Sequence, residues 1–256
     1  MIIKNIYKKI HISPFFYLLG ILSIITGLFK AFLIMYLIII IHELGHIVMA
    51  LIFNYDIKKI NIYPFGGYTI FDVDINKNIL SEFMVFLGGI LFQFIFYILF
   101  NVCVKSNTYT HIIFNSYNIT ILLFNLLPII PLDGSKLLNI ILNKFFAFKT
   151  SHILSIYISY ILILLSLILN YKNLNKCIIL FLLLNLLVNE HKNHNFIFNR
   201  FLLERYIKNI QFKKNNFIIN NRLSNMKKYV RNVFIVNNRY LSEKEVLKDK
   251  FNYKSI

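Results

Sequence analysis

Two histidines and a glutamate stand in the middle of an apolar stretch, IIIIHELGHIVMA, between Ile38 and Ala50. His42 and His46 are four residues apart, so on a helix their imidazoles lie on the same face and can bind one metal ion. The pattern HExxH on a helix is typical of zinc sites, in which the intervening glutamate, here Glu43, acts as a general base. Because zinc prefers four ligands and a catalytic site keeps one position for water, the pattern predicts a third protein ligand elsewhere.

The apolar surroundings make this motif more informative than it would be in a soluble chain. Ionisable side chains inside a membrane-spanning segment are costly and are usually functional. The alternative interpretation is that these polar residues only connect neighbouring helices through hydrogen bonds. His42, Glu43 and His46 occur in the order of a zinc-binding motif, which favours the metal site.

Asp133 is the expected third ligand. Acidic residues in or beside the apolar segments are few, and two of them, Glu82 and Glu190, stand at segment ends, where charges are common. Asp133 instead lies in FNLLPIIPLDGSK, where Pro128 and Pro131 prevent a regular helix. Unwound backbone at membrane depth is tolerated only where it is buried in protein or lines a wet cavity. A carboxylate in such a segment is therefore the best candidate to complete the site.

The composition indicates a polytopic membrane protein. Of the 256 residues, 57% are hydrophobic, and the mean hydropathy is +0.63, whereas soluble domains are about 45–50% apolar. Several apolar segments reach or approach the roughly 20 residues that cross a bilayer. They cover residues 14–29, 31–53, 83–104, 112–127, 153–169 and 177–188.

The positive charges indicate the orientation of the chain. Its formal net charge is +17, and the basic residues precede the first apolar segment and follow the last one. The positive-inside rule places both of these flanks, and hence both termini, in the cytoplasm. The same distribution predicts contact with the lipid bilayer and argues against direct binding of nucleic acid. Two cysteines are too few for a cysteine-based metal site.

The expected fold is an α-helical polytopic membrane protein with a small α+β cytosolic region at its C-terminus. Residues 1–190 are assigned to a membrane domain of about six transmembrane helices, and residues 191–256 to the cytosolic region. Between the second and third apolar segments, β-branched and aromatic residues around a Gly-Gly pair predict a short hairpin or a re-entrant loop.

The tail carries its own local signals. The stretch KYVRNVFIV predicts a strand, and the pair Asn237 and Asn238 predicts a turn after it. Ser242 with Glu245 three residues later is a capping box, which marks the start of a helix.

Four motifs occur in an order that resembles the site-2 protease family of intramembrane zinc metalloproteases. They are HELGH, PFGGY, FLGGILFQ and NLLPIIPLDG. Within the family, the chain is most similar to the stage IV sporulation protein FB group, over roughly residues 1–205. The resemblance implies His42, His46 and Asp133 as zinc ligands and Glu43 as the catalytic glutamate.

The resemblance also assigns roles outside the metal ligands. It implies that Asn125 and Pro131 lie near the substrate. From the residues alone, two roles of Asn125 are equally supported: holding the substrate, and capping backbone groups where the helix is interrupted. Two positions differ from the usual family motif, with Ile90 in place of a proline and Gln93 in place of an asparagine.

The activity implied by the resemblance is specific. Members of this group remove the N-terminal pro-sequence of a sporulation sigma factor precursor, pro-sigma-K, at the membrane surrounding the forespore. Membrane partner proteins inhibit these proteases. Their C-terminal part is a CBS-type domain that senses ATP, so the implied ligands of this chain are one zinc ion and ATP.

Other functions fit parts of the same pattern. A general site-2-type protease with another membrane substrate would carry the same catalytic residues. A catalytically silent membrane scaffold would more often have lost Glu43 or a ligand, and all four residues are present. A zinc transporter would need metal-binding residues staggered through several spans. The sequence therefore favours a protease that acts on a membrane-associated pro-protein.

Overall fold

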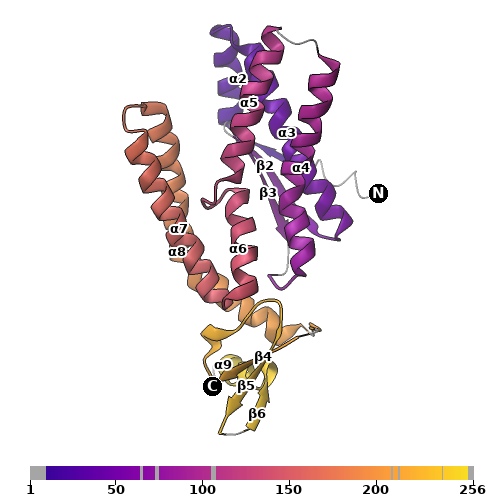
Figure 1. Cartoon of the computed structure of the whole chain (residues 1–256), viewed down its shortest axis with the longest axis vertical. Helices are drawn as coiled ribbons and strands as arrows, with labels where there is room; N and C mark the ends of the chain where they lie inside the picture. The colour runs from indigo at the N-terminus through magenta and orange to yellow at the C-terminus, as the bar shows by residue number, and fades with distance from the viewer. Residues whose placement is uncertain are drawn as a thin grey trace. The chain divides into compact units, whose positions relative to one another are not determined.

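A computed structural model describes residues 10–63, 66–72, 75–104, 108–208, 210–212, 214–237 and 239–252. The chain forms two compact units. The first contains residues 1–73 and 80–126, and the second contains residues 74–79 and 127–256. Helices dominate both units, and within the described residues each unit holds one three-stranded sheet (Figure 1).

Four described helices are long and apolar enough to cross a membrane. They are α3 (Phe29–Ile52), α4 (Ile79–Cys103), α7 (Phe148–Leu169) and α8 (Leu174–Ile207). The apolar helix α2 (Pro14–Ile25) is shorter, and α5 (Tyr109–Leu126) covers another of the expected segments. The mostly helical class with a small sheet region is confirmed, whereas the number of about six transmembrane helices stays a prediction.

The sheet of the first unit is built on a β-hairpin. Strands β2 (Asp56–Tyr63) and β3 (Gly66–Asp72) pair antiparallel, as the sequence between the second and third apolar segments predicts. A short strand that the sequence did not predict, β1 (Ile10–Ile12), adds to β2 in parallel. Both strands of the hairpin contact α3. Pro64 and Phe65 of the PFGGY motif lie outside the described residues.

Helices α3 and α4 approach each other closely at two glycines. A Cβ atom added to Gly45 would lie 2.3 Å from the backbone oxygen of Gly88. A Cβ atom added to Gly88 would lie 2.7 Å from the backbone oxygen of Gly45. Small residues let membrane helices pack backbone against backbone, where no hydrophobic effect drives their association. This packing brings the polar side chains of the two helices within hydrogen-bonding distance.

The second unit combines three helices with a mixed sheet and a last short helix. Helix α6 (Asp133–Phe145) precedes α7, and α7 and α8 lie side by side (Figure 1). Strands β4 (Asn215–Ile219) and β5 (Arg231–Val236) are parallel, and β6 (Arg239–Ser242) pairs antiparallel with β5. Helix α9 (Glu243–Asn252) follows. Helix α8 continues without a break past residue 190, so the proposed boundary at that position stays a prediction.

The tail has the expected strand and helix, with one further strand between them. Strand β5 and helix α9 confirm the local signals, and the hairpin partner β6 was not predicted. Asn237 has a positive φ of 48°, as a tight turn requires, and Asn238 lies outside the described residues. The backbone N–H of Ser242 donates to Glu245 Oε2 at 2.6 Å. This bond and the one from the Ser242 hydroxyl hold the pKa of Glu245 below its usual value.

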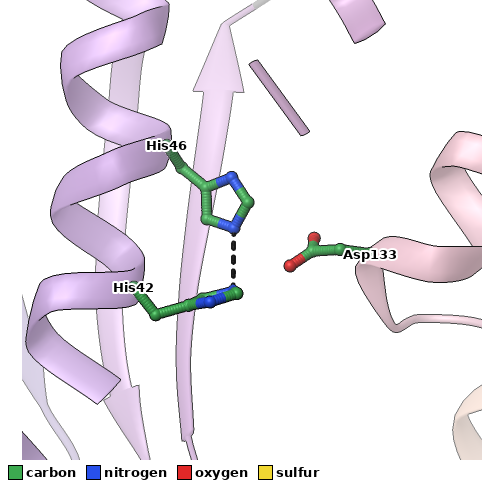
Figure 2. Close-up of side chains that lie close together, drawn as sticks. All are labelled: His42, His46 and Asp133. Carbon is green, nitrogen blue, oxygen red and sulfur yellow. Dashed lines mark hydrogen bonds between the residues drawn. The ribbon is translucent and has the colours of Figure 1, made fainter. Parts of the chain in front are cut away.

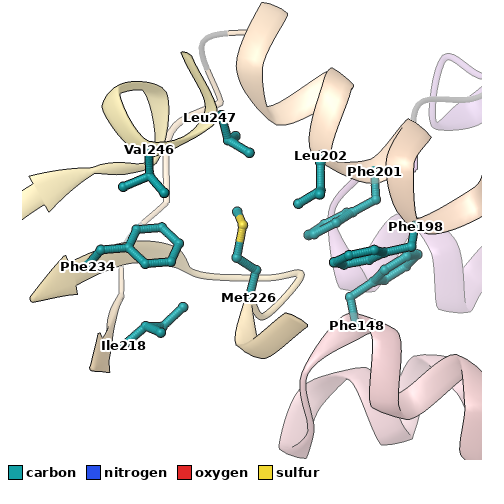
Figure 3. Packing of buried hydrophobic residues seen from close by; sticks show 9 residues of the cluster. All are labelled: Phe148, Phe198, Phe201, Leu202, Ile218, Met226, Phe234, Val246 and Leu247. Atoms are coloured by element: carbon teal, nitrogen blue, oxygen red, sulfur yellow. The ribbon is translucent and has the colours of Figure 1, made fainter. Parts of the chain in front are cut away.

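Apolar side chains from the helices and the sheet form the core of the C-terminal region (Figure 3). Their burial stabilises the region, because each large apolar side chain removed from water contributes about 1.5–3 kcal/mol. The buried members are Phe148, Phe198, Phe201, Leu202, Ile218, Met226, Phe234, Val246 and Leu247.

A buried arginine at the end of α8 ties that helix to the loop before β5. Arg205 is 2% exposed, and its guanidinium donates hydrogen bonds to the backbone oxygens of Lys227, at 3.1 Å, and of Lys228. Its Nη1 atom lies 3.6 Å from Glu243 Oε2 at the start of α9. One side chain therefore connects α8, the loop and α9.

Replacing this arginine is expected to loosen the C-terminal region. Arg205→Leu leaves buried carbonyls and Glu243 without their cation, a change that costs about 3–5 kcal/mol. The control Arg200→Leu removes a half-exposed partner of Glu204 on the same helix and is expected to cost less than about 1 kcal/mol. Hydrogen exchange of the β5 amides in detergent micelles measures the difference. Equal protection in the two variants would contradict the role given to Arg205.

Candidate metal centre

The two histidines of α3 are held by hydrogen bonds to their Nδ1 atoms. His46 Nδ1 lies 2.8 Å from the backbone oxygen of Val85, and His42 Nδ1 lies 3.0 Å from Gln93 Oε1. Gln93 Nε2 donates to the backbone oxygen of Asn118 at 3.0 Å, which fixes the orientation of this amide. Because both partners of the rings are acceptors, each imidazole carries its hydrogen on Nδ1.

The opposite ring nitrogens face each other. The Nε2 atoms of His42 and His46 are 3.1 Å apart, and both side chains are buried. With hydrogens on both Nδ1 atoms, two lone pairs point into the same space, an arrangement that a metal cation, or a proton shared between the two nitrogens, would stabilise. Zinc binds histidine nitrogen at about 2.0–2.1 Å, so two ligands of a tetrahedral site lie roughly 3.3 Å apart. The pair therefore fits a zinc ion.

The predicted third ligand belongs to the same group of side chains. His42, His46 and Asp133 each offer one ligand atom, and these atoms lie within 4.8 Å of one another (Figure 2). All three residues are buried. Two imidazole nitrogens and one carboxylate oxygen form a donor set that zinc accepts, with a fourth position left for water.

The segment that carries Asp133 is held in place by its neighbours. Asp133 is the first residue of α6, directly after the proline-containing stretch. Lys136 Nζ donates to Asp133 Oδ1 at 2.9 Å. The backbone N–H of Ile130 donates to the buried hydroxyl of Ser159 on α7 at 3.0 Å. A side chain of α7 thus satisfies a backbone group that the interrupted helix leaves without a helical partner.

Glu43 is positioned by strand β3. Its Oε2 atom accepts a hydrogen bond from the Thr69 hydroxyl at 2.8 Å. A Cβ atom added to Gly67 would lie 2.4 Å from Glu43 Cγ, so only glycine fits beside this side chain. Glu43 is half-buried and directly follows His42 in the sequence. This position suits a group that exchanges protons with water close to the metal ligands.

A further glycine keeps the space beside the histidines open. A Cβ atom added to Gly89 of α4 would lie 2.4 Å from His46 Nε2 and 2.8 Å from His42 Nε2. Both distances are shorter than any ordinary contact. The side-chain hydrogen of Gly89 therefore allows the two ligand nitrogens to occupy their positions.

The sequence also singled out Asn125, Pro131, Glu82 and Glu190. Asn125 is half-buried near the end of α5, and Pro131 follows a cis peptide bond in the segment before α6. Their contact with substrate stays a prediction. Glu82 is buried in the first turn of α4, and Glu190 Oε1 lies 3.5 Å from His152 Nε2. Neither belongs to the ligand group found among the described residues.

Sequence reasoning missed the residues that support the ligands. Gln93 was noted only as a departure from a motif, although a fully buried amide in an apolar helix signals a hydrogen-bonding role. Thr69 gave no signal, and Gly67 was noted only as part of a turn signal and a motif, because their contacts with Glu43 depend on how the hairpin packs against α3. Ser159 is the last of three serines at a spacing of four residues on α7, a pattern that could have indicated a buried polar stripe.

The chain is similar to known proteins in several comparisons. Residues 30–109 match the family described as peptidase family M50. Stage IV sporulation protein FB of Bacillus subtilis is 36% identical over 219 residues, which are 82% of this chain and 76% of that protein. A zinc metalloprotease of Methanocaldococcus jannaschii is 31% identical over 163 residues, which are 58% of this chain and 46% of that protein.

A solved structure shares the fold. The site-2 protease from Methanocaldococcus jannaschii matches 79% of this chain and 93% of its own chain, with a TM-score of 0.52 and 24% identity. Together with the sequence comparisons, this likeness places the molecule among membrane metalloproteases of the site-2 type. The chain belongs to peptidase family M50.

Adding one methyl group at Gly89 is expected to prevent metal binding. In Gly89→Ala the new Cβ atom collides with the Nε2 atoms of both histidines. The control is Gly20→Ala in α2, where the added Cβ atom would meet only the Phe32 ring at 3.6 Å. Zinc per purified chain, measured by mass spectrometry of the metal, should fall at least tenfold in the first variant only. Full zinc content in Gly89→Ala would contradict the position assigned to the metal.

Removing the amide that holds His42 is expected to weaken zinc binding. Gln93→Leu keeps a side chain of similar size but leaves the Nδ1 hydrogen of His42 without an acceptor. Loss of such an outer hydrogen bond typically weakens metal affinity 10–100-fold. The matched control is Asn101→Leu, since this amide of α4 donates to its own helix at Tyr97. Competition with a chromogenic chelator measures both affinities, and equal values would remove Gln93 from the site.

Proposed function

We propose that this chain is an intramembrane zinc endopeptidase. The observation that carries the proposal is the buried pair His42 and His46, whose Nε2 atoms face each other at 3.1 Å while their Nδ1 hydrogens are used elsewhere. Membership of a metalloprotease family supports it. So do the helices that are long and apolar enough to cross a membrane, because the HELGH motif lies within one of them.

The proposed roles follow from the chemistry of the side chains. His42, His46 and Asp133 would hold the zinc ion. A bound zinc ion would polarise the scissile carbonyl and lower the pKa of a water molecule towards about 7. Glu43 would take the proton of the attacking water on its carboxylate and return it to the leaving amine. Thr69 keeps this carboxylate oriented through its hydrogen bond to Oε2.

We further propose that the substrate is a membrane-associated pro-protein of the pro-sigma-K type. The identity of 36% with a stage IV sporulation protein supports this class of substrate. In this proposal Asn125 and Pro131 lie near the substrate, both termini face the cytoplasm, and inhibitory membrane proteins regulate cleavage at the membrane surrounding the forespore. Residues 191–256 would form the cytosolic region, and its binding of ATP stays a prediction from the resemblance.

The proton-transfer role of Glu43 can be tested by an isosteric change. Glu43→Gln keeps the shape and the zinc ligands but cannot take a proton, so processing of a co-expressed pro-sigma-K substrate should fall at least 100-fold, the lower end of general-base effects of about 10²–10⁴. Zinc content should be unchanged. The control Glu190→Gln changes a glutamate of α8 that lies outside the ligand group and should process normally.

The outcomes of this experiment distinguish the enzymatic mechanism, the proposed substrate and the alternative of a silent scaffold. Equal processing by the wild-type chain and by Glu43→Gln would contradict the enzymatic mechanism. Zinc binding without cleavage of pro-sigma-K, but with Glu43-dependent cleavage of another membrane protein, would overturn only the substrate. Zinc binding with no Glu43-dependent cleavage of any tested membrane substrate would favour the silent scaffold.

A further inference from the structure

Among the described residues, one edge of strand β4 pairs with no other strand. In the described part of the chain it is the outer strand of the order β4-β5-β6. Arg231 N–H donates to Lys214 O at 2.9 Å, and Asn220 N–H donates to Ile235 O at 3.1 Å. Backbone groups of even-numbered residues therefore face β5. By the alternation of a parallel ladder, the N–H and C=O groups of Asn215, Phe217 and Ile219 point to the other side.

A cleft runs along this edge. It has a volume of about 610 Å³, and residues 216 to 220 all line it. Side chains of consecutive strand residues alternate between the two faces of a sheet, so a cleft that touches all five follows the edge of the strand. Phe145, Phe146 and Ala147, at the junction of α6 and α7, also line the cleft.

The cleft combines aromatic surface with positive charge. Phe145 and Phe217 are exposed by 61% and 59%, and exposed apolar side chains that share one groove with polar residues at its rim are typical of an interaction site. Arg222 and Lys227 also line the cleft, and no acidic residue is among the described residues that do so. The wall therefore suits a ligand that carries carboxylates beside apolar side chains.

We propose that the edge of β4 binds an extended acidic peptide segment of a protein partner by strand addition. Backbone groups of Asn215, Phe217 and Ile219 would pair with the peptide, Phe145 and Phe217 would contact its apolar side chains, and Arg222 and Lys227 would pair with its carboxylates. Strand addition uses main-chain hydrogen bonds for affinity and side-chain pockets for specificity. This function goes beyond peptide hydrolysis and does not depend on the metal centre.

An extended peptide explains the cleft better than an anionic lipid surface does. A lipid headgroup would satisfy the two basic side chains and the exposed phenylalanines. It would leave the row of backbone donors and acceptors on β4 without partners, although such an edge readily pairs with another strand. The alternation of donor and acceptor along the cleft wall matches a peptide backbone.

The experiment compares two substitutions at one position in the full-length chain. Phe217→Pro removes the side chain and the outward N–H, a change that an edge strand tolerates because the ladder with β5 does not use this group. Phe217→Ala removes the side chain and keeps the N–H. The probes are four fluorescein-labelled octapeptides in which glutamate alternates with Val, Ile, Leu or Phe. Binding to the zinc-loaded chain in uncharged detergent micelles is followed by fluorescence anisotropy.

The expected result is saturable binding of at least one glutamate peptide. Affinity should be at least tenfold lower in Phe217→Pro than in Phe217→Ala, and it should also fall in a double variant with Arg222→Gln and Lys227→Gln. Peptides with lysine in place of glutamate, or with N-methyl groups on alternate amides, should not bind. Hydrogen exchange of the β5 amides verifies that each variant keeps its sheet.

Two outcomes would overturn the proposal. The first is the absence of saturable binding by all four glutamate peptides, and the second is equal affinity of the Phe217→Pro and Phe217→Ala variants. In the first case, binding to phosphatidylglycerol vesicles that depends on Arg222 and Lys227 would assign the cleft to the lipid surface.

Discussion

Two imidazole lone pairs that face each other inside apolar packing are the constraint on which the first unit depends. In His42 and in His46, the Nδ1–H group donates a hydrogen bond to an acceptor on α4. The relay from His42 through Gln93 to Asn118 extends over α3, α4 and α5. Partly satisfied polar groups are far more expensive in such surroundings than satisfied ones. A metal cation beside the two Nε2 atoms would complete the arrangement.

Four glycines make this polar network possible inside closely packed helices. Gly45 and Gly88 let α3 and α4 touch through their backbones, Gly89 clears the space at the ligand nitrogens, and Gly67 clears the space at Glu43. At all four, an added Cβ atom would come closer than 3 Å to a neighbour. None of these four needs a positive φ angle among the described residues, since only Gly27 has one. Their role is steric, and it sets the distances within the site.

The sequence indicates the candidate ligands more directly than it indicates the residues that contact them. HELGH and the PLDG segment carry their chemistry in residue type and spacing, so the group of His42, His46 and Asp133 could be expected from the residues alone. The hairpin and the capping box at Ser242 are also local signals. Gln93, Thr69 and Ser159 act across elements that are far apart in the sequence. Their partners follow from helix and strand packing, which periodicity does not determine.

The same distinction applies to two of the strands that were not predicted. Strand β1 has three residues, and β6 has four, so neither is long enough to show alternation on its own. Each exists because a neighbouring strand offers a backbone edge, β2 for the first and β5 for the second. Their formation is a tertiary effect.

The proposed base and the proposed metal ligands are positioned by different elements. The two histidines are oriented by acceptors behind their rings, Val85 and Gln93 of α4, whereas the carboxylate of Glu43 is oriented by Thr69 of β3. A displacement of the hairpin would therefore change the direction of the carboxylate and leave the Nδ1 hydrogen bonds of both ligands intact. In a protease of the proposed kind, this separation allows the proton-transfer step to be controlled at the hairpin without loss of the metal.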